Sequence, residues 1–102
     1  MASLGSNFKV AAIDAASSGA NTLIAGAAGK TIRVYRIVFS LASGTIIFKD
    51  GSTALSGAMT LTSLVLESQN DEPLFVTTAG SHFVATLSGA NQLSGTIWYT
   101  QS

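Results

Sequence analysis

The chain has 102 residues, and its five basic and five acidic side chains give a formal net charge of zero. Only 10% of the residues are charged, against about 25% in a typical globular domain, and this balance excludes the basic patch that a nucleic-acid partner requires. The absence of cysteine excludes disulfides and thiolate metal sites, and no apolar run approaches the roughly 18 residues of a membrane span, so we expect no membrane partner.

Short β-rich segments, separated by clusters of Gly, Asn, Asp and Ser, follow one another along the chain. β-Branched and aromatic residues dominate these segments. Ala11–Ala16 has some helical propensity, but the break at Ser17-Ser18-Gly19 would leave that helix short. The expected strands are Phe8–Ala15, Thr22–Ala25, Lys30–Leu41, Thr45–Lys49, Ala58–Leu61, Leu64–Ser68, Leu74–Thr78, His82–Ser88 and Gln92–Thr100.

This pattern predicts an all-β fold. Residues 1–102 are expected to form a single β-sandwich domain, jelly-roll-like, with about eight short antiparallel strands. Residues 1–8 could form an extended N-terminal arm. Asp50-Gly51 predicts a tight hairpin after the fourth segment, because glycine adopts positive φ without penalty.

Side-chain alternation breaks in the middle of Lys30–Leu41. Ile32 and Val34 share one face, whereas Ile37, Phe39 and Leu41 have the opposite parity. Either a β-bulge near Tyr35-Arg36 shifts the register, or both faces of this strand are covered in different places.

The last segment indicates a candidate interface. Leu93, Ile97 and Tyr99 share one face, and Trp98 lies on the other face among hydroxyl and amide side chains. A tryptophan on such a face is either an anchor for a partner subunit or is covered by a loop of its own chain. Arg33 and Arg36 could pair with acidic residues of a neighbouring subunit, or remain solvated.

No pattern predicts catalysis or a cofactor. Gly26–Thr31 resembles the end of a phosphate-binding loop, but Ile24 replaces the first required glycine and the following residues predict a strand, so we expect a turn. His82 is the single histidine and cannot build a multi-histidine metal site alone. Asp71-Glu72 lacks the spaced ligands of a calcium loop. We therefore expect a non-enzymatic protein with no catalytic, cofactor or metal residues.

Several segments together resemble small tailed-phage virion proteins, in particular capsid decoration (cement) and head-surface proteins. The resemblance extends from about Ser17 to the end of the chain. It rests on turn glycines and β-branched runs at Ser18–Ile24, Ala28–Val34, Gly44–Ser52, Leu55–Gly57, Ala79-Gly80 and Thr96–Tyr99.

The resemblance implies a homotrimer that clamps neighbouring subunits of the major capsid protein on the outer surface of the virion, after synthesis in the host cytoplasm. Loss of the protein would then leave the shells more fragile. The alternative is a receptor- or carbohydrate-binding module of a head fibre, tail or baseplate. The candidate residues for contacts with another subunit or the capsid are Phe8, Arg33, Tyr35, Arg36 and Trp98.

Overall fold

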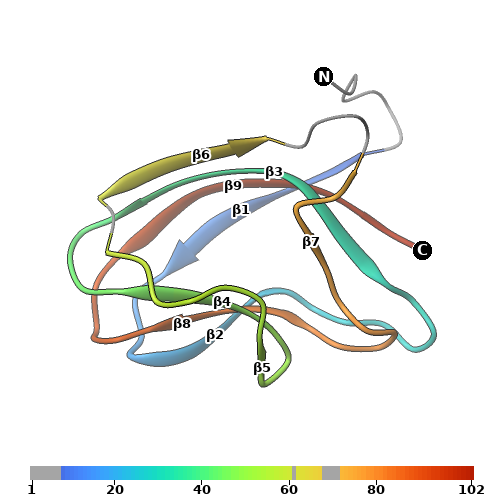
Figure 1. The fold of residues 1–102 in the computed structure, drawn as a ribbon, viewed down its shortest axis with the longest axis horizontal. Coiled ribbons are helices and arrows are strands. Elements are labelled where there is room, and N and C mark those ends of the chain that lie inside the picture. The colour runs from blue at the N-terminus through green and yellow to red at the C-terminus, as the bar shows by residue number, and fades with distance from the viewer. Residues whose placement is uncertain (1–7, 61, 68–71) are drawn as a thin grey trace.

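The computed structural model describes residues 8–60, 62–67 and 72–102, and these residues form nine β-strands and no helix. Figure 1 shows the strands in two layers. The strands are β1 (Lys9–Ala15), β2 (Gly19–Ile24), β3 (Ile32–Leu41), β4 (Ile46–Asp50), β5 (Thr53–Ala54), β6 (Ser63–Glu67), β7 (Phe75–Val76), β8 (Phe83–Leu87) and β9 (Leu93–Gln101).

The strand order is that of a jelly roll. One sheet has the order β1-β9-β3-β6, with β7 also paired to β3, and the other has the order β2-β8-β4-β5. The chain thus forms one long hairpin, in which β1 pairs with β9, β2 with β8, β3 with β6 and β7, and β4 with β5. Rolling this hairpin adds the β3–β9 and β4–β8 pairs. The predicted antiparallel β-sandwich is confirmed.

The core lies between the two sheets and is built from the inward side chains of both. Phe48 of β4 stacks on Phe83 of β8 at 5.6 Å between ring centroids, and Phe39 of β3 meets Phe48 edge-on at 5.7 Å. Offset and edge-to-face aromatic pairs of this kind stabilise a core beyond their area burial. The same alternation directs intervening residues such as Ser40 of β3 away from the core.

A β-bulge resolves the broken alternation of the longest strand. Val34 pairs with Tyr99 and Arg36 pairs with Trp98, so Tyr35 is the extra residue on β3. The bulge lets the apolar side chains on both halves of β3 face the core, and Ile32 and Ile37 are both completely buried. Of the two explanations that the sequence allowed, the register shift is the correct one.

Two segments differ from expectation. Thr53 and Ala54 form β5 after the turn at Gly51, whose φ of 59° matches the predicted tight hairpin. Ala58–Leu61 is not a strand in its described part, which makes only an isolated bridge between Met59 and Ile46. Ala11–Ala16 lies in and just after β1 and is not helical, in agreement with the expected strand Phe8–Ala15. Residues 1–7 of the expected arm lie outside the described residues.

Candidate functional site

The candidate site is the outer face of the β1-β9-β3-β6 sheet, defined as the side chains that this sheet directs away from the core. The pairing registers place these side chains in three rows across the four strands. The rows are Val10–Trp98–Arg36–Glu67, Ala12–Thr96–Val38–Val65 and Asp14–Ser94–Ser40–Ser63.

Trp98 lies near the middle of the first row, between Val10 on β1 and Arg36 on β3. The Arg36 guanidinium carbon is 4.7 Å from the centroid of the Trp98 ring, which is the geometry of a cation–π contact. Arg36 Nε also lies 3.5 Å from Glu67 Oε1. This ion pair is loose, since Arg36 Nε makes no hydrogen bond to Glu67. The buried Nε has no other hydrogen-bond partner either. Trp98 is therefore partly covered by its own chain and partly exposed.

A second aromatic contact lies at one end of the outer face. The ring centroids of Phe8 and Tyr35 are 4.9 Å apart, with an interplanar angle of 89°. Tyr35 occupies the bulge of β3, and Phe8 directly precedes β1 on the far side of β9. Arg33 belongs to the same end of β3, where it pairs with Thr100 of β9.

The structure thus brings together the five residues that the sequence suggested for an interface. Phe8 and Tyr35 form one contact, Arg36 and Trp98 form another, and Arg33 lies on the same strand as Tyr35 and Arg36. Whether these residues contact a partner stays a prediction.

Sequence reasoning missed two apolar members of the outer face. Val10 is 60% exposed and Val65 is 58% exposed. The alternation of their strands could have revealed them. Ile13 and the leucines that flank Val65 point inward, so Val10 and Val65 must point outward. Exposed apolar side chains that lie on one face are typical of surfaces that bind other proteins.

Polar contacts hold the remaining charged residue of the outer face in place. Gln92 Nε2 donates to Asp14 Oδ1 at 2.7 Å, next to its contact with Ser94 Oγ at 3.2 Å. Fixed hydrogen bonds limit the conformational entropy that a binding partner would have to remove. The outer face therefore combines apolar side chains and hydroxyls with few charges, of which Arg36 and Glu67 pair with each other and Asp14 is held by the neutral amide of Gln92.

The segments weighed for phosphate or metal binding have structural roles. Residues 27–30 form a turn closed by the Lys30 N–H donating to the Ala27 carbonyl at 3.0 Å, and β3 follows it, as expected. His82 Nδ1 accepts a hydrogen bond from the Gly26 N–H at 2.7 Å. Glu72 is exposed, and Asp71 lies outside the described residues. Within the described ranges no cluster of three metal-ligating side chains occurs.

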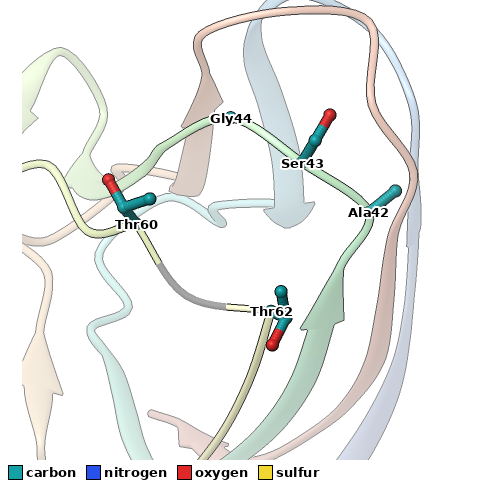
Figure 2. Close-up of a pocket in the computed structure, with 5 residues that line it drawn as sticks. All are labelled: Ala42, Ser43, Gly44, Thr60 and Thr62. Carbon is teal, nitrogen blue, oxygen red and sulfur yellow. The ribbon is translucent and has the colours of Figure 1, made fainter.

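A shallow pocket of about 250 Å³ lies beside the β3–β4 loop (Figure 2). It is lined by Ala42, Ser43, Gly44, Thr60 and Thr62. Figure 2 shows the side chains of Ala42 and Ser43 directed away from the two threonines. The five lining residues include no titratable group, and their side chains do not converge on one point.

No protein-family model matches the chain, and no similar protein was found among curated proteins or solved structures. No helix in the part of the chain that the structure describes is long and apolar enough to cross a membrane.

Proposed function

We propose that this chain is a non-enzymatic structural protein of a phage virion, which decorates and cements the outer surface of the capsid as a homotrimer. The observation that carries this proposal is the outer face of the β1-β9-β3-β6 sheet, with Trp98 near its middle and exposed Val10 and Val65 on either side. A tryptophan surrounded by hydroxyls and small apolar residues is a typical anchor of protein interfaces.

The fold supports a binding role but does not select the partner. Jelly rolls build both viral capsid domains and lectin domains. The composition favours the capsid, because a chain with 10% charged residues and no net charge favours association with other proteins. The choice of a phage capsid in particular rests on the resemblance seen in the turn glycines and β-branched runs of the sequence.

The geometry at Trp98 disfavours the carbohydrate-binding alternative. A sugar ring stacks on the open face of an aromatic side chain, whereas the Arg36 guanidinium lies over the Trp98 ring. Tyr99 belongs to the inward parity of β9 and packs against the core. Tyr35 is engaged by Phe8. The tryptophan and both tyrosines of the chain thus each make a contact within the protein, and half-buried Trp98 keeps only part of its surface for a partner.

A homotrimer suits this proposal energetically. Three copies that each bind one capsid subunit multiply weak contacts through their effective concentration, so one sheet face per copy is enough for stable attachment. The partners are further copies of this chain and the major capsid protein.

The test uses purified shells that lack the protein. We expect that adding the wild-type protein raises the temperature at which the shells release their contents. Val65→Asp places a charge in the outer face and should abolish binding. The matched control Ala20→Asp adds the same charge at an exposed position of β2, in the other sheet, and should bind normally. Equal heat stability of shells with and without bound wild-type protein would overturn the proposal.

A further inference from the structure

His82 is the single histidine of the chain and directly precedes β8, beside the segment that follows β2. Its Nδ1 accepts a hydrogen bond from the Gly26 N–H at 2.7 Å. An imidazole accepts a hydrogen bond at Nδ1 only in the neutral tautomer that carries its proton on Nε2. The contact between Gly26 and His82 therefore exists only while the imidazole is uncharged.

Protonation of His82 leaves the ring no way to keep this contact. The imidazolium has two N–H donors and no acceptor, so a rotation of the ring cannot restore the hydrogen bond. The Gly26 N–H and the Nδ1–H would point at each other, and the two groups must separate. His82 is exposed, so protons from the solvent reach it. Histidine is also the side chain whose charge changes between about pH 5 and 8.

The charged groups around His82 do not offset this loss. They are Lys30 in the segment after β2, and Lys49 and Asp50 at the end of β4, whereas residues 77–81 carry no charge. Both carboxylate oxygens of Asp50 already accept hydrogen bonds from Thr78, at 3.0 Å and 3.3 Å. In the part of the chain that the structure describes, no carboxylate forms an ion pair with His82. The charged imidazole thus gains no ion pair in exchange for the lost hydrogen bond.

The backbones of the two segments lie in direct contact at Gly26. A Cβ atom built on Gly26 would overlap the Gly80 carbonyl oxygen and lie 2.6 Å from the Ser81 carbonyl oxygen. A second hydrogen bond joins the same segments, from the Gly80 N–H to the Lys30 carbonyl at 2.9 Å. Of these two hydrogen bonds, only the one to His82 involves a titratable group.

We propose that the contact between Gly26 and His82 is a pH-sensitive switch. Neutral His82 holds residues 25–29 against the start of β8, and protonation releases them as the pH falls. The hydrogen bond between Gly80 and Lys30 persists and confines the opening to the residues between β2 and Lys30. The switch lies beside the β2-β8-β4-β5 sheet, so it does not depend on the outer face of the other sheet or on the virion proposal.

The experiment is an NMR titration, in which the imidazole signals report on His82 alone because the chain has one histidine. The Gly26 amide signal should shift with the same midpoint as the imidazole. Protection of the Gly26 amide against hydrogen exchange, relative to an unstructured chain at the same pH, should fall at least about fivefold from about pH 8 to about pH 5. This factor corresponds to the loss of one hydrogen bond.

His82→Asn is the matched control, because its Oδ1 can accept from the Gly26 N–H and does not titrate. Protection of Gly26 should therefore stay constant in this variant. Constant protection of Gly26 in the wild type across the imidazole titration would overturn the switch. An equal fall in His82→Asn would also overturn it, because another group such as Asp50 would then be responsible.

The Gly80 amide is a second control, which needs only the wild-type protein and so does not depend on the folding of a variant. Its hydrogen bond to the Lys30 carbonyl involves no titratable group, and its protection should stay constant while that of Gly26 falls. An equal fall at both amides would show a general loosening of these segments in acid and would overturn the switch.

Discussion

The Arg36 guanidinium lies over the Trp98 ring at 4.7 Å, across the pairing between β3 and β9. The bulge at Tyr35 makes this contact possible, because it shifts Arg36 onto the outer face directly opposite Trp98. Without the extra residue, the parity of Val34 would place Arg36 on the core side. A single inserted residue therefore both completes the core and builds the centre of the candidate site.

We expect Arg36→Met to lower the free energy of unfolding by about 1 kcal/mol. The substitution keeps an unbranched side chain and removes the cation, and cation–π contacts at partly exposed sites contribute about 0.5–1 kcal/mol. Urea unfolding measures the change. Glu67→Gln removes only the loose ion pair between two partly exposed side chains and should change stability by less than about 0.5 kcal/mol. Equal losses in the two variants would show that the contact with Trp98 contributes nothing.

Thr77 gives a second prediction, at the connection between β7 and the loop before β8. Its side chain is only 3% exposed, and its Oγ1 accepts a hydrogen bond from the Ile32 N–H at 3.0 Å. We expect Thr77→Val to destabilise the protein by about 1–3 kcal/mol, because it leaves a buried donor without a partner. Thermal or urea unfolding reports the change.

Thr77→Ser is the matched control for that prediction. It keeps the acceptor and loses only one methyl group, so we expect a loss of about 1 kcal/mol. If Thr77→Val were as stable as the wild type while Thr77→Ser was destabilised, packing of the methyl group rather than the hydrogen bond would be the contribution of Thr77.

The bulge illustrates what the sequence alone could predict. The change of parity between Val34 and Ile37 is visible in the order of apolar residues, and a two-residue repeat interrupted once is the signature of an inserted residue. The inward parity of Leu93 and Ile97, and hence the outward position of Trp98, followed from the same rule. Local periodicity therefore predicted the fold class and the faces of the strands.

The assembly of the candidate site depended on contacts that local periodicity does not encode. Val10 and Trp98 become neighbours only because β1 and β9 pair, although they lie at opposite ends of the chain. The edge contact between Phe8 and Tyr35 likewise spans two strand pairings. Thr53 and Ala54 were missed as a strand because both are exposed and so show no alternation.

His82 provides a prediction for the loops at the opposite end of the sandwich from the β3–β4 turn. Its Nδ1 accepts from the Gly26 N–H at 2.7 Å and so connects the segment after β2 with the start of β8. We expect His82→Ala to cost about 1 kcal/mol, the usual contribution of one hydrogen bond. His82→Asn can present its Oδ1 as an acceptor and should retain most of that stability. Amide exchange at Gly26 should be faster in His82→Ala only, and equal exchange in both variants would contradict this role.

Gly95 gives the largest expected effect, because β3 leaves no room for a side chain at this position of β9. A Cβ atom built on Gly95 would overlap the Val38 carbonyl oxygen and lie 2.8 Å from Phe39 Cα. These are backbone atoms within the β3–β9 pairing and cannot move aside without breaking its hydrogen bonds. We expect Gly95→Ala to destabilise the protein by about 3 kcal/mol, the upper range for overpacking.

Gly57→Ala is the control for that substitution, because a Cβ atom on Gly57 meets no atom within 4 Å. We expect its stability to remain within about 0.5 kcal/mol of the wild type, as for most surface substitutions. Denaturant unfolding of both variants measures the difference. If Gly95→Ala were as stable as Gly57→Ala, β9 would have to lie farther from β3, and the alignment of Trp98 with Arg36 on the outer face would have to be revised.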